Sequence, residues 1–190
     1  MRVMVTGHRP DALGGYFTPN PVEQWVRTTL RSVLEGMLKR EPKMKAITGM
    51  ALGSDQIFAE VCVELGIPFT SALAFQGQDG RWPDHAKARY NSLLRQATKV
   101  VVVDEIPAYH SDHFGGKMAL QNKWMVDHSD QAIAIWNGST DGGTYNAIRD
   151  LRRRDRKILR INPSDRVVGV DEPDSVESGP NILDFFRNRS

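Results

Sequence analysis

Three short segments combine glycine with hydroxyl, amide or charged side chains, and each follows an apolar run. They are TGHRP (6–10), TGMALGSD (48–55) and NGSTDGGT (137–144). Glycine allows close approach to a bulky anion, while hydroxyl groups and the first amides of a helix donate hydrogen bonds to phosphate oxygens. One such turn alone more often only reverses the chain. Three of them favour a cradle for phosphate and ribose.

Charged and polar side chains in these segments suggest roles for individual residues. Arg9 has the charge that a phosphate needs, although an arginine in such a loop is also a common surface residue. His8 is a candidate hydrogen-bond partner or general acid, and a structural role is equally open. Asp55, in the first turn of an expected helix, would repel phosphate there. It is assigned to ribose hydroxyls or to helix capping, with both alternatives open.

Two further segments carry side chains that could bind a ligand. Trp82 could stack on a base and Arg81 could pair with phosphate, whereas the alternative is that Trp82 packs its helix onto the sheet. Of Asn122 and Asp127, at most one is expected to point into a site, because their spacing does not place them on one helix face. His110, Asp112 and His113 have the chemistry of metal ligands but no second ligand cluster. We therefore predict no metal site and no cofactor.

The elements that must position these residues follow from hydrophobic periodicity. Near-continuous apolar runs are typical of parallel strands buried on both faces, and helical spacing fills the intervals between them. Asn20 and Pro21 mark the start of the clearest helix. The expected strands are 2–6, 44–48, 68–75, 99–104, 131–136 and 157–161, and the expected helices 21–40, 54–65, 83–97, 119–129 and 143–154. This alternation predicts an α/β fold, a Rossmann-like three-layer sandwich with a mostly parallel central sheet flanked by helices. The three glycine-containing segments would then meet at one sheet edge.

Length and composition bound the remaining expectations. The chain has 190 residues, and we expect one domain over residues 1–163 followed by an extended C-terminal tail, 164–190, rich in Ser, Asp, Pro and Glu. With 25 basic and 23 acidic residues, the net charge of +2 is too small to attract nucleic acid by itself. A single cysteine, no signal segment and no apolar stretch near ~20 residues indicate a cytoplasmic protein without membrane association, or one in a host's cytoplasm if the gene is viral. A homodimer is expected, since loops of one subunit could complete its partner's site.

Four segments in this order carry a resemblance to a known family: TGHRP, ITGMALGSDQIFAEVCVELGIPF, RWPDHAKARYNSLLRQATKVVVVDE and WNGSTDGGTYNAIRDLRRRDRKI. Over residues 1–163 the chain resembles the YpsA-like branch of the SLOG superfamily, which includes DprA-type proteins and LOG-type phosphoribohydrolases. We expect a bacterial or phage protein. The resemblance implies a Rossmann-like fold that binds nucleotides, nucleotide-derived signals or, in the DprA branch, single-stranded DNA. LOG-type enzymes use an arginine and a glutamate that follows a PGGxGTxxE pattern. In this chain Tyr145, Asn146 and Ala147 follow Gly143 and Thr144, so the glutamate is missing.

The sequence thus predicts binding of a nucleotide or nucleotide-derived small molecule, for sensing, sequestering or processing, at the carboxyl edge of the sheet. One alternative is LOG-like hydrolysis of a nucleotide N-glycosidic bond, with Asp55 or another carboxylate replacing the missing glutamate and with Asp55 and Arg81 as the candidate catalytic residues. Another is DprA-like single-stranded DNA binding, which the even charge balance makes the weakest. The candidate ligand-binding residues are Gly7, His8, Arg9, Gly49, Ala51, Gly53, Ser54, Asp55, Arg81, Trp82, Gly142, Gly143, Thr144 and Asn146.

Overall fold

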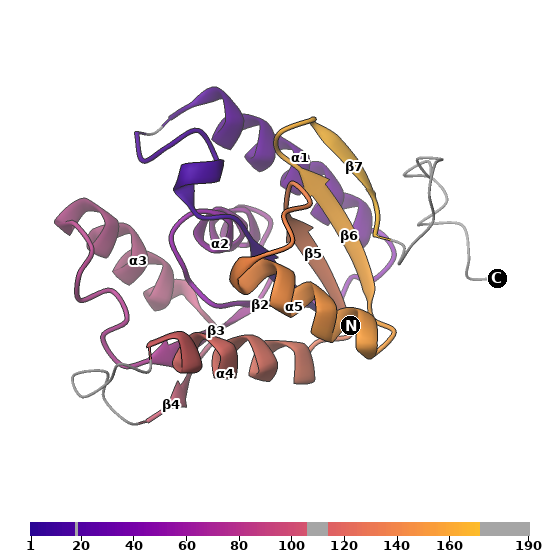
Figure 1. The fold of residues 1–190 in the computed structure, drawn as a ribbon. Helices are drawn as coiled ribbons and strands as arrows, with labels where there is room; N and C mark the ends of the chain where they lie inside the picture. Colours follow the sequence, from indigo (N-terminus) through magenta and orange to yellow (C-terminus); the bar gives the residue numbers. More distant parts are fainter. Residues whose placement is uncertain (18, 106–113, 172–190) are drawn as a thin grey trace.

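A central β-sheet organises the protein (Figure 1). The computed structural model describes residues 1–17, 19–105 and 114–171. Within them the strands are β1 (Arg2–Gly7), β2 (Lys45–Thr48), β3 (Phe69–Phe75), β4 (Lys99–Asp104), β5 (Gln131–Ile135), β6 (Lys157–Asn162) and β7 (Val167–Val170). They lie in the order β4-β3-β2-β1-β5-β6-β7, and all neighbours are parallel except β6 and β7. The six predicted strands and the Rossmann-like fold are confirmed.

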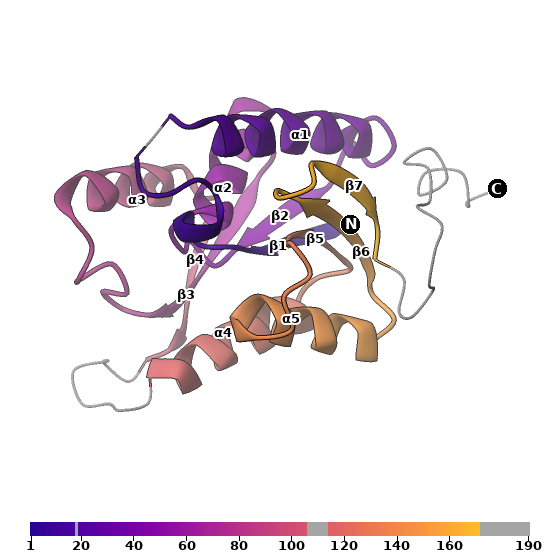
Figure 2. The same cartoon turned by 45° about the horizontal axis from the view of Figure 1, so that its top comes forward.

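Helices cover both faces of this sheet. The helices are α1 (Pro21–Leu38), α2 (Ser54–Glu64), α3 (Asp84–Gln96), α4 (Phe114–Asp127) and α5 (Gly142–Arg153). Figure 2 shows α1, α2 and α3 on one side of the sheet and α4 and α5 on the other. As predicted, α1 begins after Asn20, whose Oδ1 accepts hydrogen bonds from the amides of Val22 and Glu23 at 3.1 and 2.9 Å. Every described helix is too short or too polar to span a membrane.

The buried side chains of β1 explain why the strands are almost continuously apolar. Val3 and Val5 belong to the core under α1 and α2, whereas Met4 packs in the core on the opposite face, with Met125 of α4 and Ile148 of α5. Successive strand residues point to opposite faces, so a strand covered on both sides needs apolar residues at every position. The absence of alternation in these runs was therefore the correct signal for a parallel sheet.

The strand order reverses at β1, and this reversal fixes where a ligand can enter. β1 pairs with β2 on one side and with β5 on the other. The chain leaving β1 continues into the α1 layer, whereas the chain leaving β5 continues into α5 in the opposite layer (Figure 2). The two loops diverge at the carboxyl ends of the strands and leave a crevice between them.

The sheet continues past residue 163, where the sequence analysis expected an extended tail. Val167–Val170 forms β7, which pairs antiparallel with β6 from Asn162↔Val167 to Leu159↔Val170. Asn162 supports the turn, because its Oδ1 accepts from the Ser164 amide at 3.0 Å and its Nδ2 donates to Asp165 at 2.8 Å. A four-residue strand between polar turn residues has too little periodicity to be recognised in isolation. The rest of the predicted tail, residues 172–190, lies outside the described residues.

Candidate functional site

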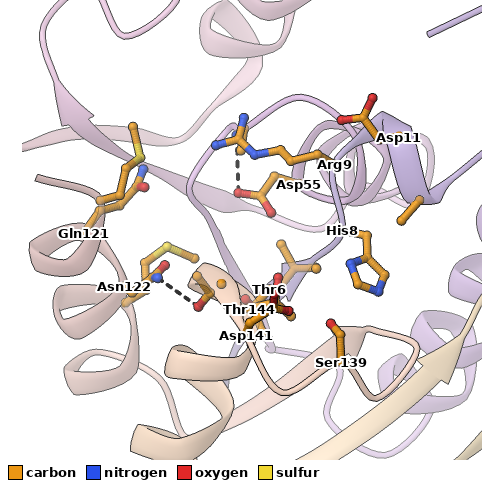
Figure 3. Close-up of a pocket in the computed structure, with 18 residues that line it drawn as sticks. Thr6, His8, Arg9, Asp11, Asp55, Gln121, Asn122, Ser139, Asp141 and Thr144 are labelled. Atoms are coloured by element: carbon orange, nitrogen blue, oxygen red, sulfur yellow. Dashed lines mark hydrogen bonds between the residues drawn. The ribbon is translucent and has the colours of Figure 1, made fainter. Parts of the chain in front are cut away.

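A pocket of about 410 Å³ lies at the carboxyl ends of β1 and β5, within the ~300–1,000 Å³ usual for small-molecule sites (Figure 3). We call it the β1–β5 pocket. It is lined by Val5, Thr6, Gly7, His8, Arg9, Asp11, Ala12, Ala51, Asp55, Met118, Gln121, Asn122, Met125, Ser139, Asp141, Gly142, Gly143 and Thr144. These residues come from the end of β1 and the segment after it, the loop between β2 and α2, the start of α2, the loop after β5, the start of α5, and one face of α4. The predicted site therefore coincides with the point where the strand order reverses.

The start of α2 is held tightly against the loop after β1. The amide and the Oγ of Ser54 both donate to the carbonyl oxygen of His8, at 3.1 and 2.9 Å. A Cβ at Gly7 would lie 2.5 Å from Ser54 Oγ, and a Cβ at Gly53, where φ is +92°, would lie 2.7 Å from the His8 carbonyl. Only glycine fits at either position. Gly7, Gly53 and Ser54 thus hold the pocket wall together, and the first amide of α2 is used by the protein itself.

Asp55 is a buried carboxyl group on this wall. Its Oδ2 accepts from the Ala51 amide at 3.3 Å, and its backbone carbonyl accepts from Thr48 Oγ1 at 3.0 Å. Burial raises the pKa of Asp55 to about 6, and the positive charge of Arg9, which lies beside it in Figure 3, acts in the opposite direction. The Asp55 carboxyl group therefore changes its protonation state near pH 6. A nearby phosphate would favour the protonated form.

His8 is the first residue after β1, and two hydrogen bonds to the β5 side fix its position. Its amide donates to the Ile135 carbonyl at 3.0 Å, and its ring Nε2 accepts from the Asn137 amide at 3.0 Å. Burial lowers the pKa of His8, so the ring is neutral at neutral pH. Because Nε2 accepts a hydrogen bond, the ring proton resides on Nδ1. His8 joins the loops after β1 and β5 and keeps one N–H donor for a ligand.

The N-terminus of α5 opens onto the pocket. Asp141 occupies the N-cap position, but its side chain makes no capping hydrogen bond. A Cβ at Gly142 would meet no atom within 4 Å, and at Gly143 it would meet only Asn122 Nδ2 at 3.6 Å. The first amides of a helix have no partner inside the helix, and those of Gly142, Gly143 and Thr144 donate to no other described residue. They are available to a bound anion.

Gln121 is the most informative residue that the sequence analysis missed. It is buried, and its Nε2 donates to the carbonyl oxygens of Gly49 and Ala72 at 2.9 and 2.6 Å. It therefore ties α4 to the residue after β2 and to the middle of β3. Only the strand order places α4 beside this edge, and helical periodicity alone does not reveal that. Thr6, Asp11, Met118, Met125, Ser139 and Asp141 are the other polar or sulfur-containing lining residues absent from the predicted set.

The structure brings together eight of the predicted ligand-binding residues, which are Gly7, His8, Arg9, Ala51, Asp55, Gly142, Gly143 and Thr144. Gly49, Gly53 and Ser54 lie behind the wall rather than on it. A Cβ at Gly49 would lie 2.9 Å from both Asp55 Oδ2 and Gln121 Nε2. Asn146 is exposed on α5 and does not line the pocket. Of Asn122 and Asp127, only Asn122 reaches the pocket, where its Nδ2 donates to the Gly143 carbonyl at 3.2 Å.

Arg81 and Trp82 lie away from the β1–β5 pocket. Trp82 packs edge-on against Tyr90 of α3, with ring centroids 5.3 Å apart and an interplanar angle of 81°. Arg81 is exposed. Both precede α3, which covers the sheet face opposite α4 and α5 (Figure 2). For Trp82 the packing alternative therefore accounts for the contact. The loop with His110, Asp112 and His113 lies outside the described residues, and no cluster of three metal-ligating side chains occurs among the residues that are described.

Comparison with known proteins places the chain in a family. The sequence model of the YspA SLOG family matches residues 3–165. The chain belongs to this family. Among its relatives is the uncharacterized SPbeta prophage-derived protein YoqJ of Bacillus subtilis, which is 31% identical over 158 residues. The match covers 76% of this chain and 91% of YoqJ. A UPF0398 protein of Oceanobacillus iheyensis is 25% identical over 86% of this chain and 89% of its own length.

Two solved structures share the fold of this chain. DNA processing protein A of Helicobacter pylori, described for its single-stranded DNA binding mode, superimposes with a TM-score of 0.55 at 16% identity, over 84% of this chain. DprA of Streptococcus pneumoniae gives a TM-score of 0.58 at 13% identity, over 85% of this chain. The chain spans 64% and 50% of the lengths of these two proteins. At such identities the likeness concerns the fold.

The first prediction concerns the tight wall between β1 and α2. Gly7→Ala should lower the free energy of unfolding by about 1–3 kcal/mol, because the added Cβ has to displace Ser54 and the Ile135 carbonyl. Gly143→Ala is the matched control, since its Cβ meets Asn122 at an ordinary 3.6 Å. Urea denaturation of both variants measures the difference. Equal stabilities would contradict the close packing described for Gly7.

The second prediction concerns the proton on Asp55. Between about pH 4 and pH 6 the folded protein keeps a proton that the unfolded chain releases, because burial raises the pKa from 3.8 to about 6. The free energy of unfolding of the wild type should therefore fall with rising pH through this window, relative to Asp55→Asn, by up to about 3 kcal/mol. Urea titrations of both proteins from about pH 4 to pH 8 test this. A pH-independent difference would mean that Asp55 has an ordinary pKa.

Proposed function

We propose that this protein binds a nucleotide or nucleotide-derived small molecule in the β1–β5 pocket. The observation that carries the proposal is the uncapped start of α5, where two glycines leave the first amides open to a cavity of about 410 Å³. The N-terminus of a helix attracts anions through its free N–H groups and its dipole. Arg9 lines the same pocket and supplies a full positive charge.

The other polar groups of the pocket suit the sugar of such a ligand. The Asp55 carboxylate is a hydrogen-bond acceptor of the kind that binds a pair of ribose hydroxyls, and the His8 Nδ1–H is a donor on the opposite side of the loop. Both side chains are already held by backbone hydrogen bonds, so little conformational entropy is lost when they bind.

The charge of the lining limits how many phosphates the ligand carries. Asp11, Asp55 and Asp141 contribute carboxyl groups, and Arg9 is the one arginine or lysine among the lining residues of the described chain. Several carboxylates repel additional phosphate charge. We therefore favour a ligand with one phosphate group, or with phosphate in diester linkage, over a triphosphate. The same balance disfavours a long single strand of DNA, whose binding depends on many cationic contacts.

The ligand prediction is tested by thermal shift with nucleoside mono-, di- and triphosphates, NAD, ADP-ribose and cyclic nucleotides. At about 100 times its dissociation constant, a ligand adds ~2.7 kcal/mol and raises the unfolding midpoint by a few degrees. Gly143→Val should abolish the shift by filling the space before α5, whereas Gly169→Val, on β7 with open space around it, should not. Arg9→Ala should weaken a nucleotide at least about tenfold and leave the matching nucleoside unaffected.

Two results would contradict the proposal. One is the absence of a shift for every compound, and the other is a shift that survives Gly143→Val. An oligonucleotide that binds with a steep salt dependence while mononucleotides do not would indicate DNA binding instead.

A second candidate function is hydrolysis of the ligand's N-glycosidic bond. The observation that favours it is Asp55, a buried carboxyl group with a pKa of about 6 that lines the pocket. Ala147 stands at the position of the LOG-type glutamate and is fully buried in the core, so a carboxyl group for this reaction has to come from elsewhere. A carboxylate stabilises the positively charged sugar of the transition state, which an amide cannot do.

The hydrolysis prediction is tested by measuring the reaction products. Incubation with nucleoside monophosphates should release free base and a sugar phosphate, and Asp55→Asn should remove this activity while ligand-induced stabilisation remains. Chromatographic quantification of the free base measures it. Absence of free base with a nucleotide that binds tightly would leave binding as the function.

A further inference from the structure

A second, smaller pocket lies on the other side of the loop that follows β1. Its volume is about 90 Å³, and it is enclosed by the short 3-10 helix Pro10–Ala12, the loop that follows it, and residues of α1, α2 and α3. We call it the α2–α3 pocket. Asp55 lines the first pocket and Gln56 the second, because consecutive helix residues point roughly 100° apart. Residues at the start of α2 therefore line two separate cavities.

Gln56 leaves a hydrogen-bond acceptor without a partner at this second pocket. The side chain is 0% exposed, and its Nε2 donates to the Met50 carbonyl at 3.4 Å. Its Oε1, on the other branch of the amide, accepts no hydrogen bond from any described residue. A buried carbonyl oxygen without a hydrogen-bond partner raises the free energy of the folded protein. A donor that enters the α2–α3 pocket would recover that free energy.

Glu23 provides a second acceptor in the same lining. Glu23 is 8% exposed, and its Oε1 forms long ion pairs with Arg27 at 3.5 Å and with Arg89 at 3.6 Å. These distances exceed the roughly 2.7–2.9 Å of a charge-assisted hydrogen bond. Arg89 instead makes its short contacts with Glu60, at 2.6 and 2.7 Å. The Glu23 carboxylate thus keeps acceptor capacity for a donor in the pocket.

The rest of the lining combines the polar side chains of His85 and Arg89 with apolar side chains that suit a flat ring. Leu13, Ile57 and Ala86 are 2%, 1% and 6% exposed. Tyr16 lies at the rim with 57% of its surface exposed, after two glycines with positive φ. An exposed aromatic beside an apolar cavity can stack on a planar group. A cavity of about 90 Å³ accommodates one ring rather than a whole nucleotide.

We propose that the α2–α3 pocket binds a single heteroaromatic ring through an amino group that donates to Gln56 Oε1 and to the Glu23 carboxylate. The ring lies between Leu13, Ile57 and Ala86, with Tyr16 over its outer side. A ring with a carbonyl at the same position binds less tightly, because it would place an acceptor against Gln56 Oε1 and Glu23, with Arg89 as the nearest donor. This site is independent of the nucleotide proposed for the β1–β5 pocket.

Cytosine and uracil form a pair of probes of the same size, in which the amino group and the N3 acceptor of cytosine are replaced by a carbonyl and an N3–H donor in uracil. Saturation-transfer NMR titrations with the full chain should give cytosine an affinity at least about tenfold higher than uracil. Gln56→Leu, which replaces the acceptor with an apolar side chain of similar size, should remove this preference. Ala86→Leu, which fills the cavity from α3, should abolish cytosine binding.

Gly143→Val separates the two pockets, since it obstructs only the β1–β5 pocket and should leave cytosine affinity unchanged. Equal affinities for the two probes, or no binding of cytosine, would overturn the proposal. Either result would mean that Gln56 binds an ordered water only. Cytosine binding that is lost in Gly143→Val and kept in Ala86→Leu would also overturn it. A failed nucleotide screen with wild-type protein would not affect this result, so the two proposals fail separately.

Discussion

The carbonyl oxygen of His8 holds together the two elements from which both pockets are built. It accepts hydrogen bonds from the Ser54 amide and from Ser54 Oγ, and this contact is reached only because Gly7 and Gly53 have no side chains. The start of α2 is thereby fixed against the end of β1. Asp55 then lines the β1–β5 pocket and Gln56 lines the α2–α3 pocket. A shift of this one contact would change the direction of both side chains.

The electrostatics of the β1–β5 pocket combine opposing contributions. The α5 amides and Arg9 attract an anion, whereas Asp11, Asp55 and Asp141 repel one. Burial keeps the Asp55 pKa at about 6, so its negative charge is partly withdrawn near neutral pH. An anionic ligand that favours protonated Asp55 should consequently bind more tightly as the pH falls toward that value. This arrangement suits a ligand with limited charge and several hydroxyl groups.

Much of the fold was predictable because its signals are local. Uninterrupted apolar runs identify strands covered on both faces, and Asn20 with Pro21 marks the beginning of α1. The glycine-containing turns were correctly expected at one edge of the sheet. β7 was not predicted, because it depends on pairing with β6 and on a turn supported by Asn162. Its four residues carry too little periodicity of their own.

By itself, the sequence determined the α/β fold, the resemblance to the SLOG superfamily and the three segments that supply glycine and hydroxyl groups. The tertiary structure decided which of those residues meet. It assigned Gly49, Gly53 and Ser54 to packing, added Gln121 from α4, and left Arg81, Trp82 and Asn146 outside the pocket. The physical reason is that local patterns specify helices and strands, whereas the strand order selects the faces that meet. Those contacts join residues more than forty positions apart, such as His8 with Ser54 and Gly49 with Gln121.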